Sequence, residues 1–197
     1  MSAVNMNVPA TLEAAQRMDA ADPLAHLRER FTLPEGVVYM DGNSLGPLPK
    51  AVRRRLIHAI DVEWGENLIR AWNTDDWFGL PQSVGAKLAR LIGAEAHEVV
   101  ATDGTSINLF KLTAAALRMQ PHRKVIVTQE GNFPTDIYVT EGLVDLLGQG
   151  HEIRLVENQD ILEALDNTVA VLALTQVDYR NGERLDMAAI TESAHIH

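Results

Sequence analysis

The sequence predicts an α/β fold in which a mostly parallel sheet is flanked by helices. Short apolar and β-branched runs alternate with longer segments that have helical periodicity. Two of these runs, residues 124–128 and 169–174, show little polar alternation, as expected for strands covered on both faces. A helical segment also separates most successive strands, and parallel strands require such crossover connections.

Each element follows from its local pattern. The runs expected to be strands are 37–40, 98–102, 124–128, 152–156 and 169–174. The segments expected to be helices are 49–70, 81–92, 105–118, 134–147 and a shorter one at 161–165. Within 49–70, apolar residues form a stripe at Val52, Leu56, Ile60 and Trp64. Gly93 and Gly148 are expected to end the helices that precede them.

The composition is that of an ordinary globular protein and excludes a disordered chain. The 197 residues carry a net charge of −10, 46% are hydrophobic, and none is cysteine, which excludes disulfides and zinc–thiolate sites. The acidic balance argues against a nucleic-acid partner. No apolar run is long enough to cross a bilayer and no signal-peptide pattern is present, so we expect a cytoplasmic protein without a membrane partner. His195 and His197 have no third ligand nearby, and we expect no metal site.

The strongest local signal lies between the expected strand 98–102 and the helix after it. Gly104 permits a sharp turn, and Thr105 or Ser106 caps the helix. A helix that begins at the carboxyl end of a parallel strand presents free N–H groups and a positive dipole end, which together suit a phosphate. The two hydroxyls would add donors. The alternative is a simple N-cap, because serine and threonine favour that position in any helix.

A second signal, residues 130–138, also follows an expected strand. Pro134 and Asp136 are typical of the first turn of a helix. Phe133 would lie at the end of the sheet where ligands bind in such folds, and could stack there on a planar ring. Alternatively, Phe133 packs back onto its own helix as a hydrophobic staple.

Two further turns complete the set. Thr175 follows the strand 169–174 and precedes the turn signal Asn181-Gly182. Its hydroxyl either faces the same crevice as Phe133 or is simply satisfied at the strand end. The loop 41–46, which contains Ser44, is either a site loop or a tight turn.

Four segments, in this order and spacing, resemble the bacterial-type kynureninases. They are 39–47 (YMDGNSLGP), 103–109 (DGTSINL), 133–136 (FPTD) and 174–182 (LTQVDYRNG). Each motif is weak by itself, but four in register make the resemblance specific. The resemblance implies a pyridoxal 5'-phosphate enzyme of the aspartate-aminotransferase fold (fold type I), usually a homodimer. It would hydrolyse L-kynurenine, or its 3-hydroxy form, to release L-alanine in tryptophan catabolism, with anthranilate as the product from L-kynurenine.

The resemblance also implies roles for individual residues. Thr105 and Ser106 match positions that hold the cofactor phosphate, and Phe133 matches the aromatic ring that stacks on the pyridine. Ser44 and Trp64 match positions in the substrate pocket. The remaining implied cofactor contacts are Pro134, Thr135, Asp136 and Thr175.

The family's chemistry requires a lysine that binds the cofactor covalently. The four lysines of this chain, Lys50, Lys87, Lys111 and Lys124, all lie within helices or at the wrong end of a strand. We therefore expect no catalytic residue of this kind, and interpret the chain as the N-terminal portion of a kynureninase. Residues 1–48 would be an N-terminal segment with a substrate-side loop, and 49–197 the first part of the cofactor-binding large domain.

Two other hypotheses fit the same residues. In one, the chain is a non-catalytic fragment or relative that binds a phosphate or a protein partner. In the other, it belongs to a different fold-type-I enzyme, such as a cysteine desulfurase-like protein.

Overall fold

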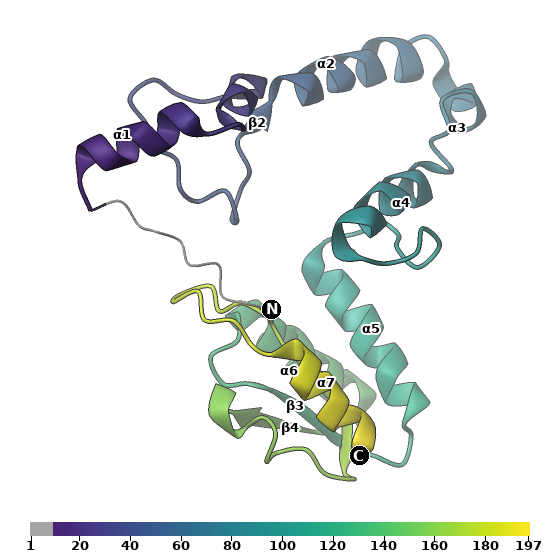
Figure 1. Cartoon of the computed structure of the whole chain (residues 1–197). Helices are drawn as coiled ribbons and strands as arrows, with labels where there is room; N and C mark the ends of the chain where they lie inside the picture. Colours follow the sequence, from purple (N-terminus) through teal and green to yellow (C-terminus); the bar gives the residue numbers. More distant parts are fainter. Residues whose placement is uncertain (1–9) are drawn as a thin grey trace. The chain divides into compact units, whose positions relative to one another are not determined.

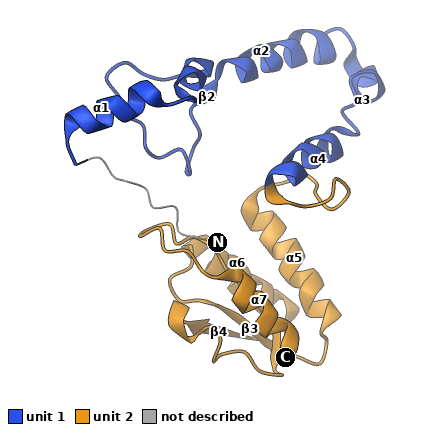
Figure 2. Cartoon of the chain, in the orientation of Figure 1, with its two compact units in different colours: residues 1–91 blue, residues 92–197 orange. Residues whose placement is uncertain are grey.

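The computed structural model describes residues 10–197 and divides the chain into two compact units, residues 1–91 and 92–197 (Figure 2). Residues 1–9, which belong to the expected N-terminal segment 1–48, lie outside the described residues. The domain boundary expected near residue 48 stays a prediction.

In its described residues, 10–91, unit 1 contains helices, turns and one short antiparallel pair, in which β1 (Phe31–Thr32) meets β2 (Leu48–Pro49). Its α-helices are α1 (Leu12–Ala21), α2 (Lys50–His58), α3 (Ala71–Thr74) and α4 (Leu80–Ile92), labelled in Figure 1. A π-helix (Ala59–Trp64) continues α2, and short 3-10 helices span Ala25–Arg30 and Leu68–Arg70.

The prediction of a single α-helix over 49–70 is therefore wrong after His58, where the α-helix ends. The widened π turn carries Glu63 inward, where its carboxylate accepts from the Arg55 guanidinium at 2.7 Å and from the Trp77 indole N–H at 2.8 Å. The indole hydrogen bond, followed by the guanidinium, lowers the pKa of Glu63. The predicted apolar stripe is exposed rather than packed, as the 65% exposure of Trp64 illustrates. A buried, paired carboxylate thus organises this helix in place of the stripe.

Unit 2 contains a parallel three-stranded sheet in the order β4-β3-β5. Its strands are β3 (Val125–Gln129), β4 (Glu152–Val156) and β5 (Val169–Ala173). All five residues of the central strand β3 are buried, which confirms the expectation of a strand covered on both faces. The predicted α/β class with a parallel sheet is also confirmed.

Helices cover both faces of this sheet (Figure 1). On one face Leu117 of α5 (Thr105–Met119) and Leu143 of α6 (Pro134–Leu147) pack on Ile126. On the other, α7 (Met187–Ile196) and the turn after β4 pack through Ile190 and Ile161. Gly148 ends α6 in the left-handed conformation, with φ of 58°, as the sequence predicts.

Three expected elements are absent from the described residues. Residues 37–40 and 98–102 are not strands, because neither segment finds a neighbouring strand in residues 10–197 to complete its hydrogen bonds. Residues 161–165 form turns rather than a helix, although Ile161 and Leu165 are buried as core residues. Of the helices in the described part of the chain, none combines the length and the hydropathy needed to span a membrane.

Candidate functional site

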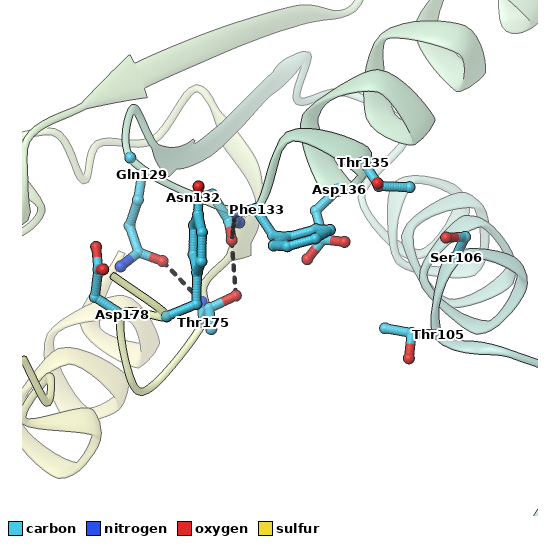
Figure 3. A pocket seen from close by; sticks show the side chains of 11 residues that line it. Thr105, Ser106, Gln129, Asn132, Phe133, Thr135, Asp136, Thr175 and Asp178 are labelled. Atoms are coloured by element: carbon cyan, nitrogen blue, oxygen red, sulfur yellow. Dashed lines mark hydrogen bonds between the residues drawn. The ribbon is translucent and has the colours of Figure 1, made fainter. Parts of the chain in front are cut away.

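A cavity of about 350 Å³ lies where the carboxyl ends of β3 and β5 meet the N-termini of α5 and α6. Its walls come from three segments: the start of α5, the turn between β3 and α6, and the chain after β5 (Figure 3). Ligands of open parallel sheets bind at this edge, since the helices that follow the strands begin there. The structure thus brings together the three segments singled out in unit 2.

The N-terminus of α5 has no side-chain cap. Gly104 holds the N-cap position in an extended conformation, so Thr105 and Ser106 are the first helical residues and do not cap it. The simple N-cap alternative is therefore wrong, and both residues line the cavity. The sharp turn is made not by Gly104 but by Asp103, with φ of 45°. Lys111 pairs with Asp103 at 2.5 Å, and this hydrogen bond lowers the pKa of the carboxyl group.

The turn between β3 and α6 places Phe133 at the cavity. Phe133 is the N-cap residue of α6, and the residue is 48% exposed. The Phe133 and Tyr179 rings form a T-shaped pair, with centroids 5.1 Å apart and planes at 73°. Because about half of the residue's surface is exposed, Phe133 can still offer contact area to a ligand. One turn further on, burial raises the pKa of Asp136, which also lines the cavity.

Thr175 is held by two amide side chains. Its N–H donates to Gln129 Oε1 and its hydroxyl donates to Asn132 Oδ1, both at 2.7 Å (Figure 3). The alternative of a satisfied hydroxyl at a strand end is therefore realised, and the residue lines the cavity as well. With its proton committed to Asn132, the Thr175 oxygen can act only as an acceptor toward a ligand.

A hairpin after β5 forms the last wall. The Asp178 carboxylate accepts from the Arg180 guanidinium at 2.8 Å and from the backbone N–H groups of Arg180 and Asn181 at 2.7 and 3.2 Å. These donors, Arg180 first, lower the pKa of Asp178 to about 2. The fold of the hairpin brings Tyr179 to Phe133, and the Arg180 guanidinium to Gly131, where a Cβ would collide with it.

Sequence reasoning did not predict five of the residues that line the cavity: Gln129, Gly131, Asn132, Asp178 and Tyr179. Gln129 ends a strand that is otherwise nearly all apolar, and Asn132 directly precedes the aromatic residue. A polar side chain at the end of a buried strand needs a hydrogen-bond partner, so Gln129 at the end of the apolar run could have been predicted to bind a neighbouring segment.

Several predicted residues lie elsewhere. Pro134 begins α6 and is not among the residues that line the cavity. Ser44 and Trp64 lie in unit 1, so their substrate roles stay predictions. The loop around Ser44 is a tight turn, in which Ser44 donates to Asp41 at 2.7 Å and the Tyr39 hydroxyl to the Leu45 carbonyl at 2.6 Å.

The chemistry of the lining is hydroxyl, amide, carboxylate and aromatic. Within residues 10–197, no lysine or arginine lines this cavity. The same part of the chain contains no group of metal-ligating side chains that could hold an ion. An anion bound here would therefore be held by hydroxyls and by the free N–H groups of a helix end.

Known proteins provide an independent comparison. A scan against protein-family models finds no match. The chain is 50% identical over 188 residues to kynureninases of Burkholderia mallei (strain SAVP1) and Burkholderia pseudomallei (strain 1106a), covering 93% of this chain and 45% of theirs. It is 51% identical over 183 residues to the kynureninase of Pseudomonas fluorescens, covering 90% of this chain and 44% of that protein. The chain is thus a homologue of the kynureninases over nearly all of its length, and it spans about 45% of theirs.

Proposed function

We propose that this chain forms the phosphate- and ring-binding part of a pyridoxal-phosphate-dependent kynureninase of fold type I. In this proposal the whole protein is a hydrolase that cleaves a carbon–carbon bond of L-kynurenine, yielding anthranilate and L-alanine, and it works as a homodimer. The observation that carries the proposal is the cavity itself. The motif segments of unit 2 that resemble kynureninases, far apart in sequence, each contribute to one cavity.

The donor set fits the phosphate of this cofactor. The start of α5 has free N–H groups with no side chain to cap them, and the Thr105 and Ser106 hydroxyls flank it. A 15-residue helix presents the positive end of its dipole at that point. This arrangement supplies several donors to a dianion without any basic side chain.

The walls that carry Phe133 and Thr175 fit the pyridine ring of the cofactor. The half-exposed Phe133 offers a flat apolar surface, and its T-shaped contact with Tyr179 stabilises the position of its ring. Beside it, Thr175 presents a hydroxyl oxygen whose lone pairs are free to accept. The cavity volume of about 350 Å³ falls in the range of about 300–1,000 Å³ that is typical of small-molecule sites.

When bound, pyridoxal phosphate supplies an electron sink for carbanion chemistry at the substrate. The residues described here would bind and orient it: Thr105 and Ser106 fix the phosphate end, and Phe133 fixes the plane of the ring. In this proposal the covalent lysine is not among the cavity residues described, so this chain contributes binding and orientation, not proton transfer.

The second hypothesis, a phosphate-binding relative without catalysis, rests on the same observation, since no lysine lines the cavity in residues 10–197. An assay of kynurenine hydrolysis distinguishes the kynureninase proposal from this non-catalytic hypothesis. The complete gene product, supplied with pyridoxal phosphate and L-kynurenine, is expected to release fluorescent anthranilate. Absence of anthranilate from a product that binds the cofactor would favour the non-catalytic hypothesis.

Binding by the chain itself is tested with pyridoxine 5'-phosphate, which has the ring and phosphate but no aldehyde to react with surface amines. Replacing Thr105→Val together with Ser106→Ala is expected to weaken binding at least tenfold, because hydrogen bonds to charged groups contribute about 1.5–3 kcal/mol each. Thr191→Val with Ser193→Ala, the same changes in α7 away from the cavity, is the matched control. Equal binding by both pairs would contradict the phosphate site.

A further inference from the structure

The side chain of Asn132 connects the two walls of the cavity that carry Phe133 and Thr175. Its Oδ1 accepts the Phe133 backbone N–H and the Thr175 hydroxyl, both at 2.7 Å. Its Nδ2 donates to the Thr128 hydroxyl oxygen at 3.1 Å. Since a backbone N–H can only donate, these partners fix which end of the amide is oxygen.

Buried polar side chains at the end of β3 extend the hydrogen bonds around Asn132. Thr128 and Gln129, at the end of the central strand, are only 3% and 4% exposed. Gln129 binds the Thr175 N–H through Oε1 and donates to Asn158 Oδ1 at 3.1 Å through Nε2. Thr175 is therefore bound twice: Gln129 accepts its backbone N–H, and Asn132 accepts its hydroxyl. Fully satisfied networks of this kind specify one arrangement of the groups they join.

Loss of the Asn132 acceptor would change both walls at once. The Phe133 N–H at the N-cap of α6 would lose its partner, and the Thr175 hydroxyl would be free to rotate. The phosphate end differs in this respect. Thr105 and Ser106 belong to α5 and take no part in the hydrogen bonds of Asn132.

We infer that Asn132 is a positioning residue for the cofactor ring, setting Phe133 and Thr175 in one fixed arrangement beside each other in the cavity. The inference rests on the proposed function, since it concerns the ring of the proposed cofactor. It assigns to Asn132 a role in orienting the ring and none in holding the phosphate.

The test compares two probes on the 197-residue chain: pyridoxine 5'-phosphate, which engages both ends of the site, and inorganic phosphate, which engages one. Asn132→Ala is expected to weaken pyridoxine phosphate binding about tenfold while phosphate binding stays within about twofold. A merely structural role would weaken both probes in proportion and lower the Tm. Asn167→Ala, at an exposed position of the same unit, is the control and should change neither affinity.

Asn132→Asp keeps the Oδ1 acceptor and the shape of the side chain. Its added charge acts on both phosphate-bearing probes, so the ratio of the two affinities should stay at the wild-type value. This variant decides the question even where Asn132→Ala does not fold, because an altered ratio in Asn132→Asp would overturn the inference. A proportional loss of both probes in Asn132→Ala, or none, would also overturn it. A wild-type chain that binds phosphate but not pyridoxine phosphate would overturn the proposed function and this inference together.

Discussion

Asp178 shows how one carboxylate shapes the wall of a site. Its side chain is 6% exposed, and it gathers the Arg180 guanidinium and two backbone N–H groups. These bonds close the hairpin that carries Tyr179 to Phe133. The sequence predicts a turn here from Asn181-Gly182, but only the structure shows that a charged side chain determines where Tyr179 lies.

Acid should weaken this hairpin. The pKa of Asp178 is lowered from an ordinary value near 3.8 to about 2, so its contribution to stability is fully present above pH 4 and is lost as the pH falls toward 2. Asp178→Asn should therefore be less stable than the wild type at pH 7, and the difference should shrink below pH 4. Thermal unfolding at a series of pH values measures this. Asp145→Asn, at an exposed site in α6, controls for the loss of one charge, and a pH-independent difference would refute the role of Asp178.

The Phe133 ring is predicted to act through its aromatic face. Phe133→Leu keeps an apolar side chain of similar reach but removes the stacking surface, which is worth about 0.5–1.5 kcal/mol. Pyridoxine phosphate binding should weaken about fivefold, and phosphate binding should not change. Phe78→Leu, at an exposed phenylalanine of unit 1, is the matched control. Unchanged pyridoxine phosphate affinity in Phe133→Leu would show that the ring does not contact the ligand.

At the scale of elements, prediction succeeded where burial is strongest. The run that became β3 is apolar because both faces of that strand are covered, and the apolar run that became β5 is buried at Val169 and partly buried in its other residues. Residues 98–102 have a similar composition, yet a strand needs a neighbour, and composition does not report one. The helix over 49–70 was misjudged for another reason: its apolar periodicity continues through Trp64, while the inward residue is Glu63.

The packing of α6 can be measured with two leucines three residues apart. Leu143 is 1% exposed and packs with Leu117 and Ile126, whereas Leu146 is 73% exposed. Leu143→Ala should lower the free energy of unfolding by about 2–5 kcal/mol, because it leaves a cavity in the core. Leu146→Ala should change it by less than about 0.5 kcal/mol. Urea unfolding of both variants tests this packing, and equal losses would mean that α6 does not bury this face.

At the scale of the whole molecule, the cavity belongs to one unit. All of its lining residues lie between Thr105 and Tyr179, inside unit 2. The sequence predicted which segments of unit 2 converge, because strand ends and helix starts share one edge of a parallel sheet. It did not predict the hydrogen bonds that the Gln129 and Asn132 side chains make with Thr175, since these depend on side-chain distances that no local pattern encodes.

Residues 92–197 should therefore bind pyridoxine phosphate without unit 1. We expect the dissociation constant of this shorter chain to agree with that of the whole chain within about threefold, since every lining residue is retained. Isothermal titration of both chains measures the two constants, with circular dichroism of the shorter chain confirming that the sheet has formed. A folded unit 2 that binds more than tenfold more weakly would show that unit 1 supplies contacts to the ligand.

The strand order has a consequence for biosynthesis. β3 is central in the sheet, yet it precedes both of its neighbours in the chain. As the ribosome releases the polypeptide, β3 emerges with neither edge paired, and its second edge waits until Val169 has followed Val125 out of the exit tunnel. Pairing across such a sequence separation is slow compared with helix formation. Phe133 and Thr175 can therefore meet only after β5 has emerged, and α5 and α6 can form before the sheet that brings their N-termini together.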